Sequence, residues 1–336
     1  MLRLTTNLLK PKPLITALIF PGQGTQSPGK MLPDSVKSLP NFNEVMDSSN
    51  RIMGYDIHSL MEGGEVKKRG SDKFYNLNDT EVSQPAIFIS TALAFQAARK
   101  EFEEYETPID LNNCVFAGYS LGEYAALYAS GKLEFPDALT MTLFRGLAMQ
   151  RDCKNRKTKL YTLITRGAAH ASIKTALQEC RQNEDEILQV SAHLAPNIYT
   201  VGGDDRAMTE LVARKREFGV LAAKPVPVSG AFHTNSMKDA AFSFSMTLKK
   251  MNGSFKENSR VCYSNVTGNA YSDIKEIKYL LPVQIRTQVK WHQIVSNLAK
   301  MDDIERVIEI GPGEGQLGKL LKMTDGKLHQ KYSYAF

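Results

Sequence analysis

The sequence of 336 residues lacks most of the features that would place it in a specialised class of protein. Its cysteines are few, and none are spaced as metal ligands or as a disulfide framework. No apolar run approaches the roughly 20 residues of a membrane-spanning helix; the longest, residues 14–20, has the length of a strand. With 42% hydrophobic and 23% charged residues, the composition is that of an ordinary globular protein, without a metal site or a membrane span. The cysteines are Cys114, Cys153, Cys180 and Cys262.

The charge pattern argues against nucleic acid as a partner. The net charge is +6, and basic residues gather at 67–69, 151–159, 214–216 and 249–250. Acidic residues interrupt these clusters, and aromatic residues are not interleaved with them, as they are in nucleic-acid grooves. Each cluster alone is typical of solvated surface, but a basic rim can also attract an acidic partner protein.

Acidic residues are missing from the N-terminal segment, where the first is Asp34. The basic residues Arg3, Lys10 and Lys12 lie in this segment, a composition found in mitochondrial presequences. We therefore expect residues 1–13 to be the remnant of a presequence; a frayed terminus is the alternative.

The order of apolar and helical segments predicts an α/β protein. A strand at 14–20 precedes a helix at 84–102, and a second strand begins at Val115. Further on we expect a strand at 225–229 and a last strand at 306–310, with no strand after it. Strands that alternate with helices favour a parallel sheet, and the chain is long enough for a second, smaller unit.

Residues 153–223 have a different order of expected strands and helices, which predicts an inserted subdomain. A strand, a helix, two strands, a helix and a strand follow one another, and this βαββαβ order is that of ferredoxin-like folds. Residues 14–152 and 224–336 then form the larger unit. The expected elements of the insertion are 160–165, 168–182, 187–192, 198–201, 204–218 and 220–223.

Ser120 has the sequence context of a catalytic nucleophile. Gly118 and Gly122 flank it in a G-x-S-x-G pattern, with an apolar strand before it and a helix-forming run after it. Such a turn forces the serine into a strained backbone and exposes its hydroxyl at a helix N-terminus, where negative charge is favoured. The alternative is an ordinary turn serine.

A serine hydroxyl needs a base, and His233 has the best context among the six histidines. It follows a predicted strand and precedes a helix, which places it at the carboxyl edge of the sheet, where sites gather. His170 and His193 fall in the inserted subdomain, and His329 in the tail. From spacing alone, a structural role for His233 remains equally open.

Glycine-rich loops carry one useful signal and two misleading ones. The loop 20–26 follows the first strand, so its N–H groups can face a developing oxyanion. Residues 24–30 have P-loop spacing, but Met31 replaces the magnesium-binding hydroxyl and Pro28 lacks an N–H. Residues 307–318 contain G-x-G-x-x-G, which we interpret as a tight turn into a last helix, since too little chain remains for a dinucleotide-binding unit.

Arg145 lies within an otherwise apolar helical segment. Burial of a guanidinium is unfavourable without a carboxylate partner. That partner is either an acidic residue of the protein or a substrate, and the residues alone leave both open.

Several segments, in this order, resemble the malonyl-CoA:acyl carrier protein transacylases, the acyltransferase family of fatty-acid and polyketide synthesis. The resemblance extends from about Ala17 to Lys322 and implies a hydrolase-like α/β core with an inserted ferredoxin-like subdomain. The segments are FPGQGTQ, QPAIF, GYSLGEYAAL, FRGLAMQ, PVSGAFHTNSM, YSNVTG, Q-x-x-x-x-V-x-W and EIGPGEGQLG.

The resemblance implies a catalytic dyad. Ser120 matches the acylated nucleophile, His233 its base, and Gln284 the residue whose backbone carbonyl orients the histidine. The backbone N–H groups of Gln23 and Leu121 match the oxyanion hole.

The same resemblance implies a site for a dicarboxylic acyl group. Arg145 matches the residue that pairs with the free malonyl carboxylate, and Gln84 a glutamine that lines the pocket. Phe232 belongs to a malonyl-type signature, in which its ring narrows the pocket against an α-methyl branch. Two departures affect neighbouring contacts: Tyr119 stands where the family usually has histidine, and 194–198 lacks the N-x-P-x-Q pattern of bacterial members.

The function implied is transfer of malonyl from malonyl-CoA to the phosphopantetheine thiol of acyl carrier protein, by a ping-pong mechanism and without a bound cofactor. The departures resemble mitochondrial members, so we expect the mitochondrial matrix, with the cytoplasm as the alternative. Arg214, Lys215 and Lys224 are predicted to dock the carrier. A serine thioesterase or hydrolase on the same core, and an inactive scaffold that binds carrier protein, are the rival hypotheses.

Overall fold

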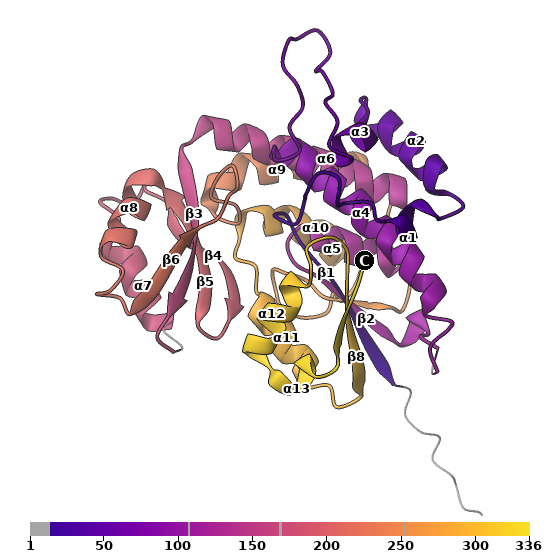
Figure 1. Ribbon diagram of the computed structural model, residues 1–336. Coiled ribbons are helices and arrows are strands. Elements are labelled where there is room, and N and C mark those ends of the chain that lie inside the picture. Colours follow the sequence, from indigo (N-terminus) through magenta and orange to yellow (C-terminus); the bar gives the residue numbers. More distant parts are fainter. Residues whose placement is uncertain (1–13, 107, 168–169, 252) are drawn as a thin grey trace, which may run out of the picture.

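The computed structural model describes residues 14–106, 108–167, 170–251 and 253–336, so the predicted presequence remnant lies outside the described residues. Its larger unit is built on a parallel sheet with the strand order β7-β2-β1-β8-β9 (Figure 1). The strands are β1 (Ile15–Phe20), β2 (Cys114–Gly118), β7 (Val261–Cys262), β8 (Ile304–Ile310) and β9 (Tyr332–Ala335).

Side chains alternate along the central strands and bury both faces of this sheet. On β1, Leu18 and Phe20 face one apolar core, and Ala17 and Ile19 face the other. The first core packs against α4 (Thr80–Glu101), α5 (Gly122–Ala129), α6 (Phe135–Asn155), α9 (Lys238–Lys250) and α10 (Ile274–Arg286). The second packs against α11 (Trp291–Ala299), α12 (Gln316–Thr324) and α13 (Gly326–His329).

Five shorter helical elements complete the large unit. Within the described residues, no helix is both long and apolar enough to cross a membrane. The short elements are α1 (Asp34–Lys37), α2 (Phe42–Met53), α3 (Ile57–Met61), η1 (Leu111–Asn113) and η2 (Asn235–Met237).

The second unit, at the left of Figure 1, is an antiparallel sheet with the order β4-β5-β3-β6. Helices α7 (His170–Glu179) and α8 (Asp205–Ala213) pack on it around a separate apolar core. This order is the one that a βαββαβ chain takes in ferredoxin-like folds, as the sequence predicted. The strands are β3 (Thr158–Thr165), β4 (Leu188–Ala195), β5 (Ile198–Asp204) and β6 (Val220–Pro225).

The strands differ from the sequence expectations at two places. The predicted strand at 225–229 is wrong: β6 continues to Pro225, and a loop follows it, because Pro227 lacks the N–H that a ladder needs. The chain also has one more strand than expected, since β9 pairs in parallel with β8. The predicted boundary at residue 153 falls inside α6, and that at 223 inside β6.

Candidate active site

The nucleophile elbow forms at the carboxyl end of β2. Ser120 has φ +53°, a left-handed conformation that a non-glycine residue adopts only under constraint. The glycines on either side of Ser120 allow the backbone segments of this turn to approach closely. A Cβ on Gly118 would lie 1.9 Å from the carbonyl oxygen of Gly122, and one on Gly122 would lie 2.2 Å from that of Phe20. Asn265, which follows β7, also fixes the turn, because its Oδ1 accepts from the Ser120 N–H at 2.6 Å.

The structure brings Ser120 and His233 together from positions far apart in the chain. Ser120 Oγ lies 2.7 Å from His233 Nε2, and His233 Nδ1 lies 2.7 Å from the backbone carbonyl oxygen of Gln284. A carbonyl oxygen only accepts, so Nδ1 carries the proton and Nε2 is left to accept from the serine hydroxyl. This arrangement is that of a nucleophile with its general base.

Burial keeps the His233 imidazole neutral. Desolvation, reinforced by the positive charge of Arg145, lowers the pKa of His233 to about 3. At physiological pH the ring is therefore ready to take the serine proton. The other histidines lie elsewhere: His58 against Phe42, and His329 against Tyr332.

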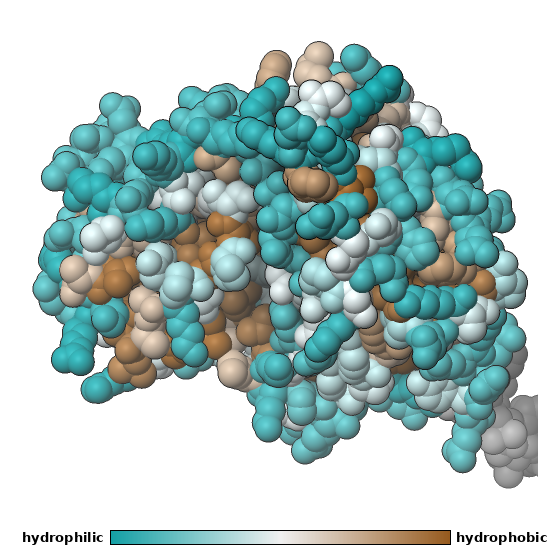
Figure 2. All heavy atoms as spheres, turned by 45° about the horizontal axis from the view of Figure 1, so that its top comes forward, coloured by the Kyte–Doolittle hydropathy of each residue, from teal (hydrophilic) through white to brown (hydrophobic). Residues whose placement is uncertain are grey.

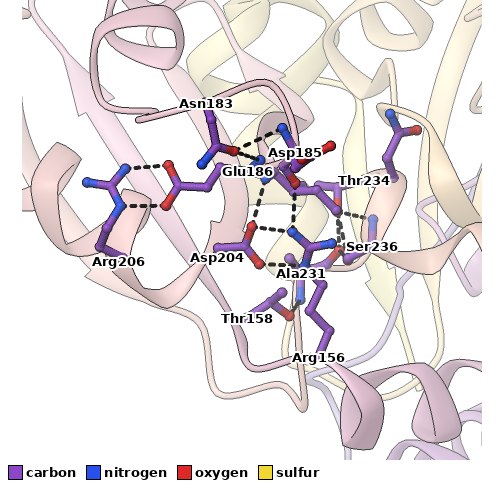
Figure 3. Close-up of polar contacts among 12 residues, drawn as sticks. Arg156, Thr158, Asn183, Asp185, Glu186, Asp204, Arg206, Ala231, Thr234 and Ser236 are labelled. Carbon is purple, nitrogen blue, oxygen red and sulfur yellow. Dashed lines mark hydrogen bonds and ion pairs between the residues drawn. The ribbon is translucent and has the colours of Figure 1, made fainter.

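The loop that presents His233 is held by hydroxyl groups (Figure 3). Thr158, at the start of β3, accepts from the Ala231 N–H at 2.9 Å. The hydroxyls of Thr234 and Ser236 both donate to the Ala231 carbonyl oxygen, at 2.6 and 2.8 Å. These bonds fix the loop between the two sheets and support the positive φ of +58° at His233.

Arg145 is buried beside the dyad, and no carboxylate of the described residues forms an ion pair with it. Its Nη1 donates to Gln84 Oε1 at 2.7 Å, and its Nη2 to Gln284 Oε1 at 2.9 Å. Nη2 also lies 3.3 Å from Ser120 Oγ, and Nε has no partner among the described residues. Burial lowers the pKa of Arg145 from its ordinary value. A cation whose direct partners are neutral amides is suited to receive an anionic substrate group.

Glu123 is a site residue that the sequence analysis missed. It is fully buried in the first turn of α5, three residues after the nucleophile. Its Oε1 accepts from the Asn265 N–H at 3.0 Å and from the Tyr271 hydroxyl at 2.5 Å. Its Oε2 accepts from Gln284 Nε2 at 2.6 Å. Burial raises the pKa of Glu123 to about 7, and these donors oppose that rise.

The Gln284 side chain connects this carboxylate to the rest of the site. Its Nε2 donates to Glu123 and to the Ser120 carbonyl oxygen, at 2.8 Å for the latter, while its Oε1 accepts from Arg145. One amide therefore links the buried anion, the buried cation and the nucleophile turn. The sequence signal that could have identified Glu123 is an acidic residue inside an apolar helix, three positions after Ser120.

The two N–H groups predicted to form an oxyanion hole lie in the loops after β1 and β2. In the part of the chain that the structure describes, neither the Gln23 nor the Leu121 N–H has a hydrogen-bond partner. Gly22 permits the close approach of these loops, because a Cβ there would lie 2.6 Å from the Tyr119 carbonyl oxygen. The ring of Tyr119 packs edge-on against Trp291, 5.9 Å between centroids.

The remaining predicted residues are spread over different environments. Phe232 is buried in the large core next to His233. Arg214 pairs with glutamates of α7, α8 and the following turn, whereas Lys224 is exposed on β6. Lys215 is half-buried. Figure 2 shows apolar surface gathered in the hollow between the ferredoxin-like unit, at the left, and the large unit.

The G-x-G-x-x-G segment is not arranged to hold a nucleotide. Gln316 begins α12, and the Glu309 carboxylate accepts from the N–H groups of Leu317 and Gly318 at 3.1 and 2.9 Å. A carboxylate thus already occupies the helix N-terminus at which a phosphate would bind. Among the described residues, no group of three or more His, Cys, Asp or Glu is placed to hold a metal ion.

Comparison with known proteins agrees with this geometry. The acyl transferase domain family matches residues 17–312. A probable mitochondrial malonyl-CoA-acyl carrier protein transacylase of Drosophila melanogaster is 31% identical over 326 residues, covering 94% of this chain and 80% of the relative. The mitochondrial malonyl-CoA-acyl carrier protein transacylase of Homo sapiens is 29% identical over 328 residues, covering 95% and 79%.

A solved structure shows the same fold. The acyl carrier protein S-malonyltransferase of Vibrio cholerae matches with a TM-score of 0.79 and 26% identity, covering 95% of each chain. The likeness includes both sheets, because it extends over nearly the whole of this chain. With the family match and the 31% identical relative, the chain belongs to the acyl transferase family, among the malonyl-CoA-acyl carrier protein transacylases.

Proposed function

We propose that this protein transfers the malonyl group of malonyl-CoA to the phosphopantetheine thiol of acyl carrier protein, through a malonyl ester on Ser120, and so supplies fatty-acid synthesis. The observation that carries the proposal is the placement of Arg145. Its buried guanidinium is hydrogen-bonded to the neutral amides of Gln84 and Gln284. Its Nη2 lies 3.3 Å from Ser120 Oγ, the atom that receives the acyl group. Glu123 reaches the guanidinium only through the Gln284 amide, so an acyl group that ends in a carboxylate supplies the anion in direct contact with it.

In the first half-reaction, His233 Nε2 takes the proton of Ser120 Oγ as this oxygen attacks the thioester carbonyl carbon. The N–H groups of Gln23 and Leu121 hold the oxyanion of the tetrahedral intermediate; loss of one such donor costs roughly 10²–10³ in rate. The carbon–sulfur bond then breaks, and the proton passes from His233 to the departing coenzyme A sulfur. Malonyl-Ser120 remains.

In the second half-reaction, the carrier thiol gives its proton to His233, and its sulfur attacks the malonyl ester. The ester carbon–oxygen bond breaks, and the proton returns to Ser120 Oγ. Between the two steps Arg145 holds the malonyl carboxylate through two parallel N–H donors, so the carbonyl keeps its orientation while the thiols exchange.

Phe232, beside His233, narrows the acyl pocket, and Gln84 and Gln284 hold the guanidinium in place. Arg214, Lys215 and Lys224 contribute positive charge for docking of the acidic carrier. Of these, Lys224 is the most accessible, because Arg214 is already engaged by three glutamates.

The mitochondrial matrix is the proposed location, on the names of the mouse, human and fly relatives. Fluorescence microscopy of the full chain fused at its C-terminus to a fluorescent protein tests this, with a cytoplasmic signal as the contrary result.

Steady-state kinetics test the reaction itself. Malonyl transfer is measured with malonyl-CoA and phosphopantetheinylated acyl carrier protein varied against each other. A ping-pong enzyme gives parallel double-reciprocal lines and malonyl-carrier as product. Free malonate in place of malonyl-carrier would identify a thioesterase, and no turnover at all would identify a scaffold.

A further inference from the structure

Helices α9 and α10 enclose an apolar groove whose lining does not include the dyad residues or Arg145. We name it the α9–α10 groove; its cavity volume is about 580 Å³. Leu248 and Pro282 are buried in its floor, while Phe242 and Tyr279 stand on its two sides.

The side chains of this groove are unusually exposed for their type. Phe242 is 68% and Tyr279 71% exposed, although both are large and aromatic. Three further apolar side chains are also exposed: Met246 on α9, and Phe144 and Leu147 on the adjoining α6. Grouped apolar side chains at a surface are typical of interaction sites, whereas isolated ones are common everywhere.

Positive charge borders the groove on both sides. Lys238 and Lys249 belong to α9, and Lys278 and Arg286 to α10. Among the described residues, no carboxylate lies within 4 Å of Lys238, Lys249 or Arg286 in an ion pair. An apolar floor between two rows of cations is complementary to a helix with an apolar stripe and acidic flanks.

We propose that the α9–α10 groove binds an acidic amphipathic helix of a partner protein, at a surface separate from Arg214, Lys215 and Lys224. Two alternatives fit less well. A second copy of this chain would bring like-charged rims together. A flat lipid surface would touch the rim but would not reach Leu248 and Pro282 in the floor.

The groove can be occupied without blocking the reaction. Phe242 and Tyr279 have no contact with Ser120, His233 or Arg145, and Gln284 faces the dyad from the opposite side of α10. The variant Phe242→Asp/Tyr279→Asp should therefore keep its folding and its malonylation of Ser120. It removes both aromatic anchors and adds charge that repels an acidic partner.

The test measures fluorescence anisotropy of a designed labelled peptide of about five helical turns, with leucines at i, i+3, i+4 and i+7 and glutamates elsewhere. We expect wild-type protein to bind it with an affinity that falls as salt rises, and the double variant to bind at least tenfold more weakly. Phe74→Asp, at an aromatic residue outside the groove that is 50% exposed, should bind as wild type does.

Four results would overturn the proposal. One is equal binding of the peptide by wild type and the double variant. The second is equal binding of a peptide with lysines in place of the glutamates. The third is binding to phosphatidylcholine–phosphatidylserine vesicles, lost in the double variant, without binding to the peptide. The fourth is a wild-type dimer in analytical ultracentrifugation that the double variant dissociates.

Discussion

Replacement of Arg145 by alanine should separate malonyl transfer from other acyl transfers. In the structure the guanidinium makes hydrogen bonds at 2.7 and 2.9 Å and leaves Nε unused, so it can receive a carboxylate in a buried, charge-assisted pair. Truncation of one partner of such a pair costs about 2–5 kcal/mol. At about 1.36 kcal/mol per decade, kcat/KM for malonyl-CoA should fall roughly 30- to 5,000-fold.

The assay is single-turnover loading of the protein from malonyl-CoA and from acetyl-CoA, followed by intact mass spectrometry. Acetyl has no carboxylate, so its loading by Arg145→Ala should be unchanged or faster. Arg145→Lys keeps the charge but loses the planar fork, and should fall between wild type and alanine. Arg151→Ala is the matched control, because Arg151 lies on the same helix, is exposed, and bonds to Ser243.

Unchanged malonyl loading by Arg145→Ala, with the variant folded, would refute the role of the guanidinium. An equal loss of malonyl and acetyl loading would refute it too. That result would mean that Arg145 only supports the positions of Gln84 and Gln284, whose Oε1 atoms lose their donor in the variant.

Three further predictions follow from the contacts around the dyad. Glu123→Gln should lower the free energy of unfolding in urea by about 1–3 kcal/mol, because an amide cannot accept from all three donors; unaltered stability would contradict the network. Gly122→Ala should abolish loading, because its Cβ would lie 2.2 Å from the Phe20 carbonyl oxygen; a variant as active as wild type would mean that the elbow is not strained. Burial lowers the pKa of His193 to about 4. Between pH 6.5 and 4 the unfolded chain therefore binds more protons than the folded chain, and the free energy of unfolding decreases as the pH is lowered. His193→Phe should make the stability loss between pH 6 and 5 shallower, by no more than about 1.4 kcal/mol, and an unchanged slope would be the contrary result.

The parts of the site that sequence could predict are those with a local signal. Ser120 lies between glycines that no other residue could replace at these distances, and the pattern is visible over five positions. The position of His233 was predicted from a strand at 225–229 that the structure lacks; a loop that follows β6 of the antiparallel sheet presents this residue. Its pairing with Ser120 across 113 positions came from the resemblance, because spacing alone left a structural role open.

The parts that sequence could not predict depend on contacts between distant segments. Glu123 takes its role from Asn265, Tyr271 and Gln284, which come from two other segments of the chain. The strand β9 has only four residues, too few for their alternation to identify it from the sequence, and it pairs with the edge that β8 offers. The strand expected at 225–229 does not form, because pairing with β3 ends at its first residues and Pro227 has no N–H to continue the ladder.

The most direct test of the account is whether the malonyl group becomes attached to Ser120. The protein is mixed with malonyl-CoA in the absence of carrier protein, quenched in acid, digested, and analysed by mass spectrometry. The account predicts a malonyl ester on the peptide that contains Ser120, absent from Ser120→Ala and formed slowly by His233→Ala. A wild-type protein that turns over malonyl-CoA without this ester, or a Ser120→Ala variant that still carries the group, would contradict it.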